Sequence, residues 1–241
     1  MERMFKKVAL SIIIWIVGSS LTILLYFAML LAVILVPFDK KRRLAHAQCF
    51  WWSDALIALN PYWDIEVTGL ENIDKKRTYV IIANHQSLAD IVIAYQTRMQ
   101  FKWVAKASLF KVPFIGWSLG LAKHIRLSRG NFSSIKKVYR QAASWLKEGM
   151  SVLFFPEGTR SANDEMGQFQ NGAFKLAIKE KVPILPVAIE GTGEAIPKGS
   201  WLFETRIPGK LKILAPIETA GFAPADFELL RDLARERLEN A

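Results

Sequence analysis

Cysteine and histidine are scarce in this chain of 241 residues, which contains one cysteine and three histidines. The lone Cys49 excludes an intramolecular disulfide, which agrees with a protein whose folded part faces the reducing cytoplasm. One cysteine and three histidines offer no spacing typical of metal ligands, so we expect neither a metal ion nor a cofactor. The chain also lacks a Gly-x-Ser-x-Gly sequence, which argues against a hydrolase with a nucleophilic serine.

Charge is absent from residues 8–38, a run of 31 residues that is far too long for the apolar region of a cleaved signal sequence. About 20 apolar residues cross a bilayer as a helix. Because basic flanks tend to stay cytoplasmic, the run is predicted as a helical hairpin that enters and leaves one leaflet, with a tilted single span as the alternative. Residues 18–20 (Gly-Ser-Ser) supply the expected break between two segments too short to span. The flanking cations are Arg3, Lys6 and Lys7 before the run and Lys40, Lys41, Arg42 and Arg43 after it.

Acidic residues are absent from residues 91–147, a stretch with eleven lysines and arginines in a chain of net charge +10. No recognisable nucleic-acid-binding module accompanies these cations, so nucleic acid is not an expected partner. Anionic membrane lipids, phosphorylated substrates and an acidic carrier protein fit the charge better. A solvated basic face around a core helix is the alternative that requires no partner.

Short apolar segments alternate with amphipathic ones after the basic cluster. Strands are predicted at residues 79–83, 103–105, 125–127, 151–155 and 186–189, with a weaker candidate at 211–214. Apolar side chains at spacings of three and four predict helices at residues 131–147 and 225–240. The alternation predicts an α/β fold with a mainly parallel sheet flanked by helices. Residues 1–50 form the predicted membrane anchor and residues 51–241 the folded domain.

A histidine and an aspartate five residues apart follow the first predicted strand, in Asn-His-Gln-Ser-Leu-Ala-Asp at residues 84–90. An imidazole is well suited to take the proton of an attacking hydroxyl, and a carboxylate can fix its tautomer. Positions five apart on a helix point about 140° apart. We therefore expect His85 in the loop, Ser87 at the N-cap and Asp90 in the first helical turn. A helix cap with an ordinary salt bridge is the alternative without chemistry.

A second polar segment, Phe-Pro-Glu-Gly-Thr-Arg-Ser at residues 155–161, follows the predicted strand at 151–155. Proline and glycine break the strand into a turn. Main-chain N–H groups in such a turn, together with the guanidinium of Arg160, can bind a phosphate. Since ligands of α/β folds bind beyond the carboxyl ends of strands, the two polar segments are predicted to form one site.

These two segments, followed by Val-Pro-Ile-Leu-Pro-Val at residues 182–187, resemble the glycerolipid acyltransferase family, in particular its bacterial 1-acyl-glycerol-3-phosphate acyltransferases. The resemblance covers residues 79–198 and includes Gly191-Thr192-Gly193 and a Pro-Lys-Gly run at 197–199. It implies that the 2-hydroxyl of lysophosphatidic acid attacks an acyl thioester and gives phosphatidic acid. His85 would take the proton, and Asp90 would support the imidazolium.

The resemblance also implies roles for the residues around the second segment. Arg160 and the main chain of Gly158 and Thr159 would hold the substrate phosphate, and Glu157 would orient Arg160 or a glycerol hydroxyl. Acyl-CoA or acyl carrier protein would be the donor, as a substrate rather than a cofactor. The basic flanks and the lone cysteine predict a location at the inner, cytoplasmic membrane with the catalytic domain on its cytoplasmic face, and the basic clusters predict anionic lipids as partners.

Two positions depart from the usual family pattern. Lys106 and Arg129 are further candidate phosphate ligands, but Ser108 and Ser128 stand where family members usually carry acids. The departures leave open an acyltransferase of the same mechanism that acts on another lysophospholipid or a lyso-aminolipid. A non-catalytic lipid-binding protein is the third possibility, against which the intact histidine and aspartate argue, because binding alone needs no base.

Overall fold

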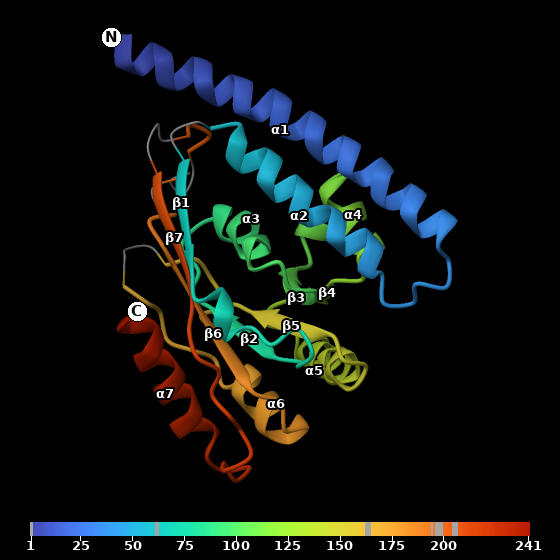
Figure 1. Cartoon of the computed structure of the whole chain (residues 1–241), viewed down its shortest axis with the longest axis vertical. Coiled ribbons are helices and arrows are strands. Elements are labelled where there is room, and N and C mark those ends of the chain that lie inside the picture. The colour runs from blue at the N-terminus through green and yellow to red at the C-terminus, as the bar shows by residue number, and fades with distance from the viewer. Residues whose placement is uncertain (1, 61–62, 162–164, 194, 196–199, 204–206) are drawn as a thin grey trace.

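The structure, a computed structural model, describes residues 2–60, 63–161, 165–193, 195, 200–203 and 207–241. Within these residues a seven-stranded sheet has the order β1-β7-β6-β2-β5-β3-β4 (Figure 1). Neighbouring strands are parallel except for β6 and β7. The mainly parallel sheet of the sequence prediction is confirmed. The strands are β1 (Trp63–Thr68), β2 (Val80–Ala83), β3 (Phe101–Lys106), β4 (Ile125–Leu127), β5 (Ser151–Phe154), β6 (Ile184–Glu190) and β7 (Ile207–Ile213).

Helices cover both faces of the sheet. Successive residues of its central strands point to opposite faces and therefore pack against different layers of helices. Ile81 belongs to a core cluster with residues of α1, α2 and α3, whereas Val80 and Ile82 belong to a second cluster with residues of α5, α6 and α7. The helices are α1 (Glu2–Leu35), α2 (Arg43–Ala58), α3 (Ala89–Ala94), α4 (Ile115–Leu121), α5 (Phe132–Lys147), α6 (Gly172–Glu180) and α7 (Phe227–Glu239), with short 3-10 turns at Leu70–Asn72, Tyr95–Thr97 and Leu109–Lys111.

The predicted break in the apolar run is wrong, because α1 is one uninterrupted helix of 34 residues. The hydroxyls of Ser20 and Thr22 donate to the carbonyls of Ile16 and Gly18 four residues earlier, so they stay inside the helix and cap no turn. A Cβ atom at Gly18 would lie 3.4 Å from Leu56 of α2. The glycine therefore allows close packing of two helices rather than a bend.

Helix α1 packs along the rest of the protein (Figure 1). In its first half, Trp15 Nε1 donates to the carbonyl of Trp201 at 2.7 Å. Near its centre, Trp52 Nε1 donates to Thr22 Oγ1 at 3.1 Å, and Leu25 and Met29 are buried in the same core cluster as the sheet. Helix α2 runs through position 50, the predicted boundary between anchor and folded domain. The anchor thus shares a hydrophobic core with the sheet.

Helix α2 buries an imidazole against β3. His46 is fully buried, and neither of its ring nitrogens has a hydrogen-bond partner among the described residues. Its ring packs edge-on against Tyr95 and Phe101. Burial, and next the charge of nearby Lys102, lower the pKa of His46 from 6.5 to about 3.

Acid will weaken the packing of α2 through His46. The folded-state pKa lies below the unfolded value, so the stabilisation is complete above pH 6.5 and is lost as the pH falls toward 3. We expect the free energy of unfolding to fall by about 1 kcal/mol per pH unit in this window from His46 alone. His46→Phe keeps an aromatic ring and removes the titration. Unfolding of both proteins at pH 7 and pH 4.5 should show a smaller loss in the variant, and equal losses would contradict the assignment.

Candidate active site

The segments that the sequence predicted as one site meet at one edge of the sheet. β2, β5, β3 and β4 are consecutive parallel neighbours, so their carboxyl ends lie side by side. His85 follows β2, the segment with Arg160 follows β5, Lys106 ends β3, and Arg129 follows β4. This is the edge at which α/β folds bind ligands.

His85 and Asp90 form the predicted pair, with Nδ1 and Oδ2 2.7 Å apart. Helix α3 starts at Ala89 with Leu88 at its N-cap, so the predicted N-cap was placed one residue early. The hydroxyl of Ser87 instead accepts the N–H of Ala89 at 3.3 Å. Asp90 lies in the first helical turn, as predicted, and from there it turns back to the histidine.

The carboxylate of Asp90 is fully buried and accepts hydrogen bonds from four donors. Besides the imidazole, Oδ2 accepts the N–H groups of Gln86 at 2.7 Å and Ser87 at 2.8 Å. Oδ1 accepts the hydroxyl of Thr192 at 2.5 Å. These donors compensate the burial of a charged group. Since the carboxylate only accepts, it holds the tautomer of His85 with a proton on Nδ1, which leaves Nε2 as a base.

The main chain of His85 is held by the segment after β5. Glu157 is buried, and its Oε1 accepts the N–H of His85 at 2.7 Å while its Oε2 accepts that of Gly167 at 2.9 Å. The carbonyl of His85 accepts the N–H of Ser161 at 2.9 Å. No bond joins Glu157 to Arg160 among the described residues. The contacts of Glu157 therefore differ from the predicted ones, and its role toward substrate stays a prediction.

Two further contacts orient the histidine and were missed from the sequence. The imidazole packs on Phe155, with ring centroids 4.3 Å apart and planes 30° apart. The side chain of Asn84 bonds both the carbonyl and the N–H of Ile189, at 2.7 and 2.8 Å, and so joins the end of β2 to β6. An asparagine directly after a fully apolar strand was the signal for this contact, because a buried amide needs partners.

Three cations lie along the same edge, and none has a partner in the part of the chain that the structure describes. Within the described ranges, the side chains of Arg160, Lys106 and Arg129 make no hydrogen bond or ion pair. Lys106 and Arg129 are exposed and Arg160 is half-buried. The N–H of Gly158, predicted to bind phosphate, donates to the carbonyl of Phe155 at 3.0 Å inside the turn. A phosphate at this edge would therefore find donors in these side chains rather than in the N–H of Gly158.

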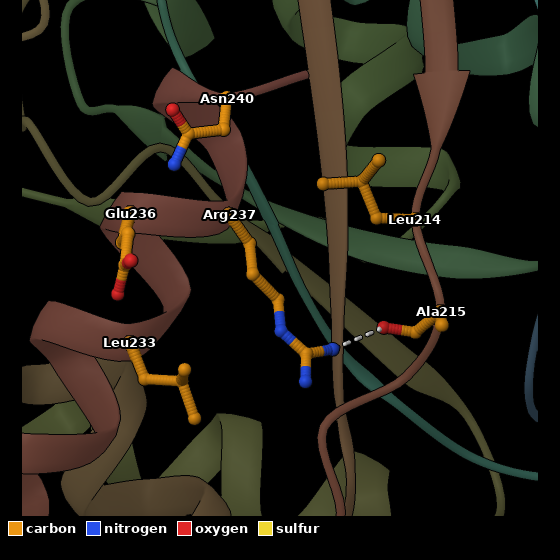
Figure 2. Close-up of a pocket in the computed structure, with 6 residues that line it drawn as sticks. All are labelled: Leu214, Ala215, Leu233, Glu236, Arg237 and Asn240. Carbon is orange, nitrogen blue, oxygen red and sulfur yellow. Dashed lines mark hydrogen bonds between the residues drawn. The ribbon is translucent and has the colours of Figure 1, made fainter.

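An open hollow of about 470 Å³ lies between α7 and the chain that follows β7 (Figure 2). Leu214 and Ala215 follow β7 beside the amino-terminal half of β6, where the N–H of Leu214 donates to Pro186. Arg237 of α7 donates to the carbonyl of Ala215 at 3.2 Å (Figure 2). The hollow is separate from His85, and none of its lining residues matches a predicted site.

Comparisons with known proteins agree with this geometry. The Acyltransferase family model matches residues 64–190. The chain is 39% identical over 191 residues to a 1-acyl-sn-glycerol-3-phosphate acyltransferase of Chlamydomonas reinhardtii, covering 77% of this chain and 55% of that protein. It is 37% identical over 150 residues to the 1-acyl-sn-glycerol-3-phosphate acyltransferase of Pseudomonas aeruginosa, covering 62% of this chain and 56% of that protein.

A solved structure matches nearly the whole chain. The crystal structure of the 1-acyl-sn-glycerophosphate (LPA) acyltransferase PlsC from Thermotoga maritima superposes with a TM-score of 0.86 at 29% identity, covering 99% of this chain and 95% of that one. The chain spans about half the length of the first curated relatives it matches. The match of the family model over more than half of the chain, with the His85 and Asp90 pair inside it, shows that this protein belongs to the Acyltransferase family.

Proposed function

We propose that this protein transfers an acyl chain from a thioester to the 2-hydroxyl of 1-acyl-glycerol 3-phosphate and so makes phosphatidic acid. One observation carries the proposal: a histidine bonded to a buried carboxylate lies at the sheet edge that also presents three cations with no partner among the described residues. The names of the relatives from Chlamydomonas reinhardtii and Pseudomonas aeruginosa support the choice of acceptor.

His85 acts as the general base. Its Nε2 takes the proton of the 2-hydroxyl as the oxygen attacks the thioester carbonyl, and Asp90 stabilises the imidazolium that forms. Collapse of the tetrahedral intermediate breaks the carbon–sulfur bond, and the imidazolium returns the proton to the leaving thiolate. No covalent enzyme intermediate is required. The bonds that hold the main chain of His85 keep the base in place while both substrates are aligned.

The cations at the edge serve the phosphate of the acceptor. Charged donors bind a phosphate more strongly than neutral ones, and Arg160, Lys106 and Arg129 have no carboxylate partners among the described residues. Acyl-CoA and acyl carrier protein, both carriers of an acyl thioester, are the proposed donors, and the chemistry uses no metal or cofactor.

The proposal is tested with purified protein, a panel of lysolipids and both donors, with products identified by mass spectrometry. Phosphatidic acid made from lysophosphatidic acid is the expected product. Ser108 and Ser128 favour a second candidate, an acyltransferase with another acceptor. Family members usually carry acids at these two positions, and without those negative charges the region discriminates less between head groups of different charge. A product formed only from another lysophospholipid or a lyso-aminolipid would replace the proposed acceptor, and absence of transfer to every acceptor would refute the acyltransferase assignment.

Arg160→Ala should raise the KM for lysophosphatidic acid and leave kcat nearly unchanged. Loss of one charge-assisted hydrogen bond costs on the order of 1.5–3 kcal/mol, which corresponds to a KM roughly 10- to 100-fold higher. Arg140→Ala, on the exposed face of α5, is the matched control and should behave like the parent. Equal KM values for the parent and Arg160→Ala would show that the phosphate binds elsewhere.

We propose that α1 lies in the plane of one leaflet of the inner membrane, with the catalytic domain on the cytoplasmic face. A helix of 34 residues is about 51 Å long, which exceeds the roughly 30 Å of a hydrocarbon core. Its contacts with Trp201, Trp52 and the core bind it lengthwise to the folded domain. Its opposite face exposes large apolar side chains to the surroundings: Ile12, Ile13, Ile16, Ile23, Leu24, Phe27, Leu31, Ile34 and Leu35. A perpendicular span would draw packed elements of the domain into lipid.

Labelling will distinguish the two orientations. Lys6→Cys and Lys40→Cys are made singly in a Cys49→Ala background, in inverted and right-side-out membrane vesicles, and treated with an impermeant thiol reagent. We expect both cysteines to react only in inverted vesicles, because both ends of α1 face the cytoplasm. Reaction of the two positions from opposite sides would show that α1 spans the bilayer.

A further inference from the structure

The turn after β6 brings a hydroxyl beneath the carboxylate of the catalytic pair. β6 lies next to β2, with Val187 in register with Ala83, and ends at Glu190. Gly191 has φ 73°, and a Cβ atom there would lie 2.0 Å from the carbonyl oxygen of Pro208. The chain can therefore turn here only with glycine. The next residue, Thr192, is fully buried.

We infer that Thr192 is a positioning residue that fixes the rotation of the Asp90 carboxylate, an inference that rests on the proposed function of the same site. Its Oγ1 lies 2.5 Å from Asp90 Oδ1 and 3.3 Å from Gln86 Oε1. A hydroxyl has one proton to donate, and the shorter distance together with the charge of the carboxylate directs it to Asp90. Among the described residues, Thr192 is the sole partner of Oδ1.

The two carboxylate oxygens have unequal tasks. Oδ2 accepts the imidazole of His85 and two N–H groups, all within 2.8 Å. Rotation of the carboxylate about its Cβ–Cγ bond would move Oδ2 off the line to His85, and the bond from Thr192 to Oδ1 opposes that rotation. Without the hydroxyl, Oδ1 becomes a buried acceptor with no donor, which favours such a rotation.

The position of the hydroxyl is itself fixed by the fold. The side chain of Asn84 joins the end of β2 to Ile189 of β6 through two hydrogen bonds, three residues before Thr192. The β-branched side chain of threonine also restricts its own χ1 rotation. A residue 102 positions away from Asp90 thus reaches it through two neighbouring strands rather than through the local loop.

Two substitutions separate positioning from packing, since each removes a different half of the side chain. Thr192→Val keeps the shape and loses the hydroxyl, whereas Thr192→Ser keeps the hydroxyl and loses the methyl group. We expect Thr192→Val to lower kcat roughly 10- to 100-fold with little change in KM, and Thr192→Ser to stay within a few-fold of the parent. The reverse order, an active valine variant and an impaired serine variant, would show a packing role and overturn the inference.

A spectroscopic readout keeps this test independent of the substrate assignment. In protein with ¹⁵N-labelled histidine at pH 8, the His85 signals are identified by their loss in His85→Ala. The parent should show protonation of Nδ1 in a single tautomer, and Thr192→Val should shift toward a mixture that Thr192→Ser does not show. Unchanged His85 signals in the valine variant would refute the inference. If Thr192→Val shows the shifted tautomer but the parent does not acylate lysophosphatidic acid, the proposed function is refuted and the inference about Thr192 stands.

Discussion

Replacing His85 with alanine will lower the acyl transfer rate by roughly 100- to 10,000-fold, the contribution usual for a general base. The imidazole is the group at this edge whose free nitrogen can take a proton from a hydroxyl, because Asp90 occupies its other nitrogen at 2.7 Å. Its side chain is 17% exposed and so lies open to a substrate. The loss should appear in kcat, since the imidazole that is removed binds neither the phosphate nor the acyl chain in the proposed mechanism.

The fold should survive this substitution. The main-chain bonds from His85 to Glu157 and Ser161 do not depend on its side chain. Initial rates with lysophosphatidic acid and a thioester donor measure the effect, and the thermal midpoint and cosedimentation with vesicles serve as controls for folding and membrane binding. A variant that is folded and transfers acyl chains at near the parental rate would refute the role of His85 as base.

The sequence was sufficient to predict the central strands and the contact between His85 and Asp90, because both depend on local patterns. Buried parallel strands appear as continuous apolar runs, and five of them were found within two residues of their observed ends. The position of His85 in the loop before α3 followed from helix periodicity alone, because residues five apart on one helix could not face each other. Two long amphipathic helices, α5 and α7, were found for the same reason.

The elements that were missed depend on partners distant in sequence. β1 alternates half-buried and exposed residues at the edge of the sheet, where its pairing with β7 supplies the order that its composition does not indicate. Gly18 was taken for a helix break because nothing local reveals that Leu56 packs against it. The contacts of Glu157 and Thr192 were hidden for a similar reason, since each reaches the loop after β2 from more than seventy residues away.

Asp90→Asn should reduce kcat almost as severely as loss of the base while preserving the fold. The amide oxygen can replace Oδ2 and accept the same three N–H groups, and the amide nitrogen can replace Oδ1 and donate to Thr192, whose hydroxyl can accept as well as donate. Every buried hydrogen bond then has a counterpart, but the negative charge that stabilises the imidazolium is gone. The variant therefore isolates the effect of charge from that of geometry.

Asp54→Asn is the matched control, because Asp54 is an exposed carboxylate of α2 whose partners, Arg98 and Gln96, lie outside the loop of residues 84–90. It should keep the parental kcat and lose little stability, as surface ion pairs contribute about 0–1 kcal/mol. If Asp90→Asn is folded and keeps a kcat within a few-fold of the parent, the carboxylate serves only to cap the loop. If its kcat falls roughly 100-fold or more while Asp54→Asn is unaffected, the charge of Asp90 takes part in the proton transfer, because the hydrogen bonds around it are retained.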